Sequence, residues 1–492
     1  MIKNPSLYEI NTRVWIRQFD TEEKKAVLDD VPDSYWIELK RKGMDYIWLM
    51  GIWRTNPSTI KKYCYEENLT RSYRAALKDW KDEDVIGSPY SIDKYELNPE
   101  LGDEQTLQKL RGRLHVLGLK LILDFIPNHF SAESSLIQSN PEVFLQTDKE
   151  LFERDRHTYF LQDGNERKYF AHGRDPFFPA WQDTVQVNYF SDVARDFMIR
   201  SLINISNVSD GVRADMAMLA LNNVFKNTWA GVLDKLGYSK PGTEFWSLAI
   251  SIVKDINPEF IFLAEAYWDL EWDLQQLGFD FTYDKKLTDR IETGYVPDIK
   301  DHLFAEQSYQ EKSIRFLENH DEKRSAAVLG NGKTIAAATL ISTIQGMRFY
   351  YDGQFEGKKI KLPVQLGREP AEHKNYFIED YYKILLPAVN TEIFKYGDWR
   401  MMEVLPAWDG DTTFYNILAW QWQYKDEIRL VVINFSDSHA RARIKLDTRG
   451  YFEVFSLTDL LTDQKYVRSS GEVFNAGLYV ELKNYQSHIF AF

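Results

Sequence analysis

The residues most able to do chemistry stand where apolar segments of this chain end. The segment "DGVRAD" (210–215) carries Arg213 and Asp215 two residues apart. Because the side chains of a strand alternate between its two faces, these two would point the same way. Taken alone, such a pair is most often a structural salt bridge beside an Asp-Gly turn. Other apolar segments end in the same manner, with Asp124, His129, Glu265, Asn319, His320 and Asp321.

Three of these acids, Asp215, Glu265 and Asp321, have the side chains that cleavage of a glycosidic bond requires. That reaction needs one carboxylic acid to protonate the leaving oxygen and one carboxylate to attack the sugar or activate water. Clustered carboxylates raise one another's pKa, so one stays protonated near neutral pH while the others ionise. Arg213 would hold its neighbour Asp215 ionised, as a nucleophile must be.

Strands that alternate with helices would bring these residues to one place. Amphipathic helical patterns, for example at 104–118 and 333–346, separate short β-rich runs. These runs are found at 8–16, 46–50, 120–125, 210–215, 260–265, 279–284, 314–319 and 347–351. Eight strand–helix units predict an α/β fold, a closed (β/α)₈ TIM barrel with its chemistry at the carboxyl ends of the strands. The alternative is an open doubly wound sheet, although no Gly-rich phosphate loop follows the first strand.

Two regions depart from the regular alternation. The stretch from Asp124 to Asp215 is far longer than one strand–helix unit needs, which predicts an inserted irregular subdomain after the third strand. A second long loop, 51–98, follows the second strand. Past residue 395, alternating strands predict a C-terminal antiparallel β-sandwich. The predicted domains are the barrel (1–130 and 191–395), the inserted subdomain B (131–190) and the C-terminal β-sandwich (396–492).

Composition narrows the class of partner and the compartment. A chain of 492 residues is long enough for up to three domains and a large core. The net charge of −14 argues against nucleic acid or an anionic membrane, because phosphate binding needs clustered Lys and Arg. The single Cys64 excludes an internal disulfide, and no segment has about 18 uninterrupted apolar residues. These observations predict a cytoplasmic protein and fix no oligomeric state.

The motifs resemble those of the α-amylase superfamily, glycoside hydrolase family 13, along nearly the whole chain. They occur in the order of the family's four conserved regions, and the long insert falls between the first two. The four are "DFIPNH" (124–129), "DGVRADMAM" (210–218), "FLAEAYW" (262–268) and "FLENHDEKR" (316–324). The resemblance implies a retaining α-glycoside hydrolase that acts on α-1,4-glucans or maltooligosaccharides through a covalent glycosyl-enzyme.

The resemblance also implies a role for each acid. Asp215 would be the nucleophile, Glu265 the general acid and then the base, and Asp321 would bind ring hydroxyls and favour the transition state. Arg213 would orient the nucleophile. The other residues implied to contact the sugar in subsite −1 are Tyr90, by stacking, and His129 and His320, by hydrogen bonds to hydroxyls.

Four further residues belong to the same motifs. Tyr267 and Trp268 come just after the acid and could stack against the next sugar, although aromatic side chains at a strand end often simply pack. Asp124 would fix the loop that presents His129. Asn128 lies in the same motif, and in calcium-dependent relatives its position holds a structural metal.

The sequence differs from that of calcium-dependent relatives in two places near this metal site. Met218 and Leu219 stand where many calcium-dependent α-amylases carry Lys-His. In "TVQVNY" (184–189), which is similar to the family's fifth conserved region, Gln186 stands where a calcium-binding Asp is common. The sequence therefore predicts no cofactor, and it leaves a structural calcium at Asn128 without a complete ligand set.

A further difference from relatives concerns which substrates the enzyme would cleave. Exo-acting α-glucosidases of the family usually place Asp directly after the stacking tyrosine, where it holds the free end of the substrate. Here Ser91 follows Tyr90. This favours an enzyme that acts within a glucan or on maltooligosaccharides over one that releases only glucose.

Three alternatives remain open from the sequence. A 4-α-glucanotransferase would use the same residues and resolve the same intermediate with a sugar hydroxyl. A non-catalytic carbohydrate-binding homologue has no reason to keep all of Asp215, Glu265 and Asp321. A metal-dependent barrel enzyme would need a tight ligand set such as His-x-His or His-Glu-x-x-His, which the sequence lacks.

Overall fold

The computed structural model describes residues 2–162 and 167–492, and its centre is a closed barrel of eight parallel strands. Around the barrel the strands follow the order β1-β15-β14-β13-β12-β11-β5-β2. Their bounds are β1 (Ser6–Asn11), β2 (Tyr46–Met50), β5 (Lys120–Phe125), β11 (Gly211–Ala214), β12 (Ile261–Ala264), β13 (Phe281–Tyr283), β14 (Ser313–Arg315) and β15 (Met347–Tyr351). The predicted (β/α)₈ barrel is confirmed, and the open doubly wound sheet is not formed.

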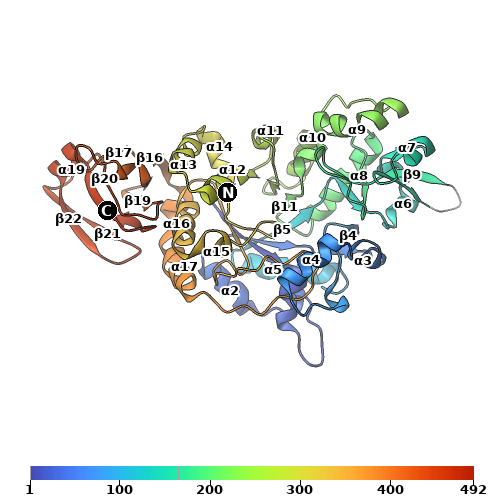
Figure 1. Ribbon diagram of the computed structural model, residues 1–492, viewed down its shortest axis with the longest axis horizontal. Helices are drawn as coiled ribbons and strands as arrows, with labels where there is room; N and C mark the ends of the chain where they lie inside the picture. Colours follow the sequence, from blue (N-terminus) through green and yellow to red (C-terminus); the bar gives the residue numbers. More distant parts are fainter. Residues whose placement is uncertain (1, 163–166) are drawn as a thin grey trace.

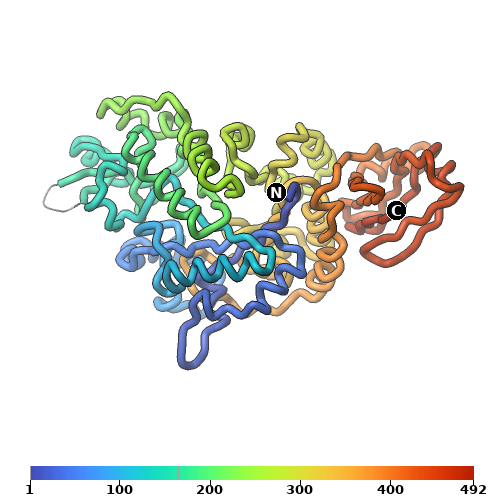
Figure 2. The backbone as a smooth tube through the Cα atoms, turned by 180° about the vertical axis from the view of Figure 1, so that it is seen from behind, coloured from blue at the N-terminus to red at the C-terminus, as the bar shows by residue number. Residues whose placement is uncertain are grey.

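Helices cover the outside of the barrel (Figures 1 and 2). The longer ones are α2 (Asp33–Arg41), α5 (Glu104–Val116), α8 (Asp192–Ser206), α9 (Asn222–Leu236), α10 (Phe245–Ile256), α12 (Lys285–Thr293), α13 (Val296–Leu303), α16 (Gly330–Thr343) and α17 (Tyr376–Val389). The shorter ones are α11 (Glu271–Gln276), α14 (Gln307–Glu311), α15 (Ser325–Val328) and α18 (Glu392–Tyr396).

Helix α5 shows how the sequence sets these elements. The side chain of Asp103 caps its first turn by accepting a backbone hydrogen bond. Leu107, Leu110 and Leu114 recur at helical spacing and are buried against the barrel. The helix ends before Gly118, which adopts a φ of 70° and turns the chain into β5.

The first strand is shorter than the predicted 8–16. Strand β1 ends at Asn11, and the helix α1 (Thr12–Trp15) follows it. The cause is Arg13, whose buried guanidinium donates hydrogen bonds to the carbonyls of Gly87, at 2.7 Å, and Val364, at 3.1 Å. These bonds draw the chain out of the sheet.

Alternation along β1 separates two apolar layers. Leu7 belongs to the cluster inside the barrel, whereas Tyr8 and Ile10 pack in the larger core between the barrel and its helices. Glu9 therefore shares the inward face with Leu7, and its side chain is fully buried.

The insert after β5 consists of two small sheets. Strand β10 (Thr184–Gln186) pairs antiparallel with β6 (His129–Ser131), and β7, β9 and β8 form a three-stranded sheet. The latter are β7 (Gln146–Thr147), β8 (Tyr159–Gln162) and β9 (Lys168–Ala171), with the helices α6 (Leu136–Ser139) and α7 (Lys149–Arg154). The bounds 131–190 for this subdomain stay a prediction.

The segment 51–98 is more ordered than the loop predicted there. It contains the antiparallel pair β3 (Trp53–Thr55) and β4 (Ile92–Leu97), with the helices α3 (Ser58–Tyr63) and α4 (Glu67–Ala76) between them. Tyr73 and Ala76 of α4 are buried, so this segment packs on the barrel rather than extending from it.

The C-terminal part is built from two antiparallel sheets, ordered β16-β18-β19-β24-β21-β22 and β17-β20-β23. The strands are β16 (Asp398–Met401), β17 (Val404–Leu405), β18 (Ile417–Tyr424), β19 (Glu427–Asn434), β20 (Ala440–Ile444), β21 (Val454–Asp459), β22 (Lys465–Ser469), β23 (Leu478–Leu482) and β24 (Ser487–Ala491), with the helix α19 (Ser470–Ala476). Alternate residues of both sheets share one apolar cluster, so the predicted C-terminal sheet domain is confirmed.

The larger C-terminal sheet also packs against the barrel. Trp420 and Trp422 of β18 face the main core, and the indole nitrogen of Trp422 donates to the carbonyl oxygen of Thr343 in α16 at 2.6 Å. In Figures 1 and 2 this domain and the insert lie at opposite ends of the molecule. None of the helices in the described part of the chain has the length and apolar character that spanning a bilayer requires.

Candidate active site

Neighbouring barrel strands bring the first two acids together. Asp215 directly follows β11 and Glu265 directly follows β12. Arg213 lies below them, fully buried. Its Nη1 is 2.6 Å from Oδ1 of Asp215, and its Nη2 is 2.8 Å from Oε2 of Glu265. One guanidinium therefore holds an oxygen of each carboxylate.

Two further donors orient Glu265. The backbone N–H of Met216 donates to Oε2 at 2.7 Å, and the hydroxyl of Tyr267 donates to Oε1 at 2.9 Å. Burial raises the pKa of Glu265 to about 7, against the attraction of Arg213 and with added repulsion from Asp215. The acid is thus half-protonated near neutral pH, as a general acid should be.

Asp215 competes with Glu265 for the same positive charge. Burial raises the pKa of Asp215 as well, although Arg213 opposes the rise. One guanidinium can balance one ionised carboxylate, so the pair is most stable with a single proton shared between the two acids.

The third acid, Asp321, faces open space. Its side chain is 50% exposed, whereas that of Asp215 is 11% exposed. Oδ2 of Asp321 lies 3.0 Å from Nε2 of His320, and the amide oxygen of Asn319 accepts the N–H of Asp321 at 2.9 Å. Partial loss of water around this half-exposed side chain raises the pKa of Asp321, but the ring of His320 holds that pKa below its ordinary value.

A cavity of about 610 Å³ adjoins this acid. Helix α4 forms one wall, through Ser72 and Ala76, and the segment after β15 forms another. From that segment the ammonium of Lys361 donates to the backbone oxygen of Asp321. The cavity is large enough for a sugar ring beside Asp321.

Tyr90 and His320 form a stacked pair beside the acids. Their ring centres are 5.4 Å apart, with planes at 24°, and the hydroxyl of Tyr90 lies 2.8 Å from Nε2 of His320. Arg213 lies over the ring of Tyr90 at 5.6 Å and over that of Trp48 at 5.1 Å. This contact of a buried cation with two aromatic faces fixes the floor of the site.

His129 lies in the first pair of the insert, on β6. Burial lowers its pKa to about 4, so the ring is neutral at physiological pH. Its ring centre is 5.3 Å from that of Trp181. A neutral imidazole can donate one hydrogen bond and accept another, which suits a sugar hydroxyl.

Asp124 supports the turn after β2. It accepts hydrogen bonds from the indole nitrogen of Trp48, at 3.0 Å, and from the N–H of Gly51, at 2.7 Å. Its own carbonyl accepts from the indole nitrogen of Trp53 at 2.7 Å. In the structure, its side-chain bonds thus go to the β2 turn rather than to the segment that carries His129.

Asn128 is in contact with an amide group in place of a cation. Nε2 of Gln186 donates to the backbone oxygen and to Oδ1 of Asn128, both at 2.9 Å. A calcium ion would need these oxygens free to coordinate it. Across residues 2–162 and 167–492, no group of three or more His, Cys, Asp or Glu is arranged to hold a metal. The residues present do not fit the family's calcium.

The two aromatic residues after Glu265 behave differently from each other. Tyr267 turns back to the acid, as described above. Trp268 is 36% exposed and adopts a φ of 65°. It meets Phe177 of the insert edge to face, with ring centres 4.9 Å apart, and Phe177 is 67% exposed. Sequence reasoning missed Phe177, whose only signal was its place in an aromatic-rich insert.

Glu9 of β1 was also missed. Its Oε1 lies 2.5 Å from Nδ1 of His320, on the side of the ring opposite Asp321. The available signal was the alternation along β1, which places Glu9 on the inward face with Leu7.

The comparisons with known proteins agree with this geometry. The α-amylase family, described as "Alpha amylase, catalytic domain", matches residues 38–196, a range that contains Tyr90, Asp124 and His129. "Alpha-amylase 3" of Dictyoglomus thermophilum is 21% identical over 318 residues, 59% of this chain and 60% of that protein. "Alpha-amylase MalA" of Haloarcula japonica is 20% identical over 455 residues, 90% of this chain and 57% of that protein.

The chain thus spans somewhat more than half the length of these two curated relatives. Among solved structures, the maltogenic α-amylase AmyB of Thermotoga neapolitana superposes with a TM-score of 0.69 at 19% identity. The superposition covers 100% of this chain and 99% of that one, so the two share a fold along their whole length. The family match over residues 38–196, the curated relatives and the shared barrel all agree with the resemblance of this chain to the α-amylase family, glycoside hydrolase family 13.

Proposed function

We propose that this protein is a retaining glycoside hydrolase that acts on α-1,4-glucans or maltooligosaccharides. The observation that carries the proposal is the contact of one guanidinium with two carboxylates, Asp215 and Glu265. The single positive charge supports one ionised acid and leaves the other protonated. A nucleophile and a general acid need these two states. Release of shorter sugars from maltoheptaose, followed by chromatography, tests the activity.

Each acid has a step in the proposed reaction. Asp215 attacks the anomeric carbon while Glu265 gives its proton to the leaving oxygen. Glu265, now ionised, takes a proton from water, which attacks the same carbon and releases Asp215. Asp321 faces the open cavity and accepts hydrogen bonds from ring hydroxyls. Tyr90 stacks under the sugar.

The shared contact of the two acids with Arg213 favours retention. A retaining site has its carboxyl groups about 5–5.5 Å apart, whereas an inverting site needs about 6.5–9.5 Å to admit a water molecule. Arg213 contacts Asp215 and Glu265 through the two terminal nitrogens of one planar group. This shared contact keeps one oxygen of each carboxylate within 2.8 Å of the same guanidinium, which supports the shorter separation of a retaining site.

Ser91 cannot anchor the free end of a substrate. Its side chain is 2% exposed, and its hydroxyl donates to the backbone oxygen of Asp183 at 2.7 Å. We therefore expect maltooligosaccharides to be cleaved internally or in units larger than glucose. A maltoheptaoside blocked at its non-reducing end should be hydrolysed as well. Chromatography of early products from both substrates is the measurement.

Glucose as the sole early product, with the blocked substrate inert, would contradict this specificity. Asp183 would then be the residue to change, because it brings a carboxyl group from the insert to the neighbourhood of Ser91. Burial raises the pKa of Asp183 to about 6. In that case Asp183→Asn should restore cleavage of the blocked substrate, while the three acids of the site are untouched.

We further propose that the enzyme works without calcium. Because the amide of Gln186 donates to both oxygens of Asn128, a chelator should leave activity and melting temperature nearly unchanged. Thermal unfolding and turnover of maltoheptaose, each with and without chelator, are the measurements. A large fall in melting temperature that added Ca²⁺ reverses would refute the proposal.

A 4-α-glucanotransferase remains the second candidate, and one observation favours it. Trp268, three residues after Glu265 in the chain, forms an exposed pair with Phe177 that offers an aromatic surface to an acceptor sugar. A transferase would convert maltoheptaose into longer and shorter chains, whereas a hydrolase yields only shorter ones.

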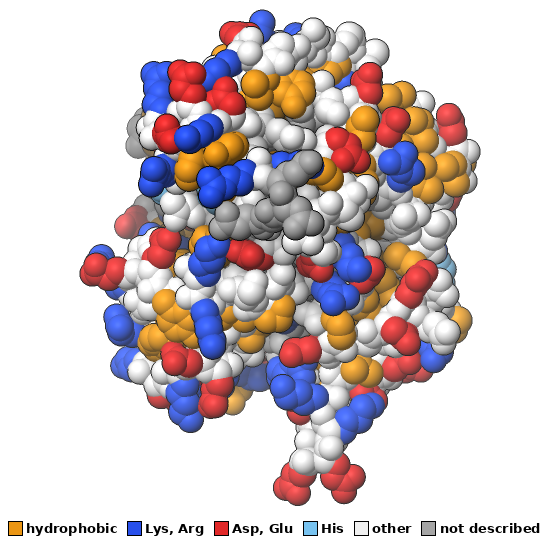
Figure 3. Space-filling model, turned by 90° about the vertical axis from the view of Figure 1, so that its right-hand side faces the viewer, with side chains coloured by type: hydrophobic (Ala, Val, Ile, Leu, Met, Phe, Trp, Pro, Cys, Tyr) orange, Lys and Arg blue, Asp and Glu red, His pale blue; other side chains and the backbone are white. Residues whose placement is uncertain are grey.

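The surface charge and the single cysteine support the expectations about the kind of partner and the location of the protein. The face in Figure 3 carries acidic and basic side chains intermixed, and the net charge is −14, which suits a neutral glucan better than a nucleic acid. The single Cys64 is buried and free. A cytoplasmic location stays a prediction that this cysteine supports.

A further inference from the structure

Glu9 is a buried acid inside the barrel that no step above uses. Its side chain is fully buried, and Oε1 lies 2.5 Å from Nδ1 of His320. On the far side of the same ring, Nε2 lies 3.0 Å from Oδ2 of Asp321. We propose that Glu9 is a positioning residue that holds His320 as an imidazolium, and that this cation in turn fixes Asp321 for the sugar.

Within residues 2–162 and 167–492, the side chain of Glu9 has no hydrogen-bond partner other than His320. In the β1 register it lies beside Trp48 of β2 and Tyr351 of β15. The ring of Trp48 meets His320 edge to face at 5.6 Å and closes the space around it. The second oxygen of Glu9, Oε2, is buried and has no hydrogen-bond partner. A half-satisfied buried carboxylate is costly, so its one contact, with His320, is the interaction that accounts for its position.

Hydrogen-bond chemistry then sets the state of the ring. Ionised carboxylates only accept hydrogen bonds, so the nitrogen that faces Glu9 needs a hydrogen. The approach of Nε2 to Asp321 at 3.0 Å is attractive only when Nε2 carries a hydrogen as well. Such a ring is positively charged. Burial favours the neutral ring, but the two carboxylates raise the pKa of His320 well above its ordinary value.

Other titratable groups lie around Glu9, His320 and Asp321, on several strands. Asp124 of β5, Arg213 of β11 and Asp215 act on it through charge, and Tyr90 touches Nε2 with its hydroxyl. The remaining ones are Tyr283 of β13 and Tyr351 of β15. Two further cations lie near: Arg213, which is held by Asp215 and Glu265, and Lys361, which donates to the backbone oxygen of Asp321 and also lowers its pKa. Among the described residues, His320 is the cation in contact with the carboxylate of Asp321.

The proposal rests on the proposed function only where Asp321 binds sugar. In Glu9→Gln the amide oxygen can still accept from Nδ1, but the charge is gone and the ring becomes neutral, with a bare Nε2 facing Asp321. We expect kcat on maltoheptaose to fall roughly 10- to 100-fold with KM changed less, as for loss of a charge-assisted hydrogen bond. The acid limb of the pH profile should move to higher pH, because Asp321 loses the cation that keeps it ionised.

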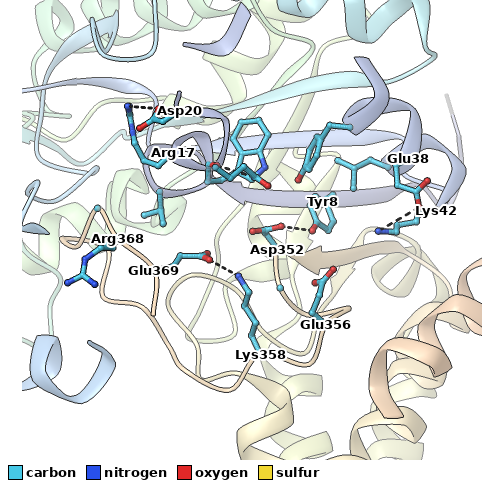
Figure 4. Close-up of a pocket in the computed structure, with 17 residues that line it drawn as sticks. Tyr8, Arg17, Asp20, Glu38, Lys42, Asp352, Glu356, Lys358, Arg368 and Glu369 are labelled. Atoms are coloured by element: carbon cyan, nitrogen blue, oxygen red, sulfur yellow. Dashed lines mark hydrogen bonds and ion pairs between the residues drawn. The ribbon is translucent and has the colours of Figure 1, made fainter. Parts of the chain in front are cut away.

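Tyr8→Phe is the matched control. Tyr8 is the neighbour of Glu9 on β1 but faces outward, where its hydroxyl donates to Asp352 at 2.7 Å beside a separate cavity of about 630 Å³ (Figure 4). The substitution also removes one buried hydrogen bond. It should leave kcat and the pH profile within a few-fold of wild type.

A spectroscopic reading separates this proposal from the hydrolase assignment. The protein has nine histidines, and His320→Gln identifies the resonances of His320 after labelling with ¹⁵N-histidine. At pH 7.5 (a chosen condition) both ring nitrogens should give the signals of an imidazolium in wild type and in Tyr8→Phe. In Glu9→Gln one nitrogen should give an unprotonated signal. Glu9→Asp, which keeps the charge, should recover part of kcat on maltoheptaose and part of the imidazolium signal of His320.

The outcomes are distinct. A neutral His320 in the wild-type spectrum would overturn the proposal, as would a Glu9→Gln protein whose spectrum and pH profile equal those of wild type. If Glu9→Gln does not fold, the wild-type spectrum and Glu9→Asp still decide. An imidazolium in a protein that hydrolyses no glucan would leave the role of Glu9 standing and refute the proposed function.

Discussion

Asp215→Asn should lower kcat on maltoheptaose by roughly 10⁴-fold or more, because the amide cannot form the covalent intermediate. The substitution is isosteric, and its oxygen can still accept the hydrogen bond that Nη1 of Arg213 now gives to Asp215 at 2.6 Å. Folding and sugar binding should therefore be largely preserved. Steady-state kinetics, thermal unfolding and calorimetric binding of maltoheptaose measure the three quantities.

Asp352→Asn is a suitable control, since it makes the same change just after another barrel strand. Asp352 follows β15 and faces the separate cavity of Figure 4, where it accepts from Tyr8. Its variant should keep activity within a few-fold of wild type. Retention of a tenth of the wild-type rate by Asp215→Asn would refute its assignment as the nucleophile.

Glu265→Gln should lower kcat on maltoheptaose by roughly 10²- to 10⁴-fold, the usual contribution of a general acid. α-Maltosyl fluoride should form the glycosyl-enzyme almost as fast as in wild type, because fluoride leaves without a proton. The second step should then be slow, since no base activates water. A burst of fluoride followed by a slow steady state is the expected trace.

The pH profile gives a second reading of the same variant. The pKa of Glu265 is raised to about 7 by burial, and catalysis needs its protonated form first. The rate should therefore fall as pH rises through about 7, and this alkaline limb should vanish in Glu265→Gln. Equal losses on maltoheptaose and the fluoride, or an alkaline limb that persists, would show that another group is the acid.

The barrel and the meeting of its acids were predictable because both follow from short-range patterns. Apolar runs of strand length alternate with helices such as α5, and parallel neighbours in a closed barrel present their carboxyl ends on one side. Arg213 and Asp215 were placed on one face by their spacing alone. Adjacency of β11 and β12 then brought Glu265 to the same guanidinium.

The contacts between distant segments were not predictable in this way. An acid in the first strand is typical of a solvated face, so Glu9 gave no sign that its partner would be His320, more than three hundred residues away. Phe177 meets Trp268 only because the insert folds over the barrel. The β-rich run 8–16 predicted a longer first strand, but the chain leaves the sheet after Asn11, where the buried Arg13 is hydrogen-bonded to Gly87.

Short, weakly apolar elements were missed for a related reason. Strands β16, β17 and β22 have few buried side chains, so they lack the apolar run that signals a strand. They form because longer neighbours offer free hydrogen-bonding edges, as β18 does for β16 and β21 for β22. The helices α3 and α4 of segment 51–98 are likewise short and mostly polar.

The configuration of the first-formed product tests the central claim most directly. Two successive displacements at the anomeric carbon, by Asp215 and then by water, return the sugar to its original α configuration. Proton NMR of maltoheptaose in the first minutes after enzyme is added, before mutarotation mixes the anomers, should show new reducing ends in the α form. New reducing ends in the β form would mean a single displacement by water, and would contradict a covalent intermediate at Asp215.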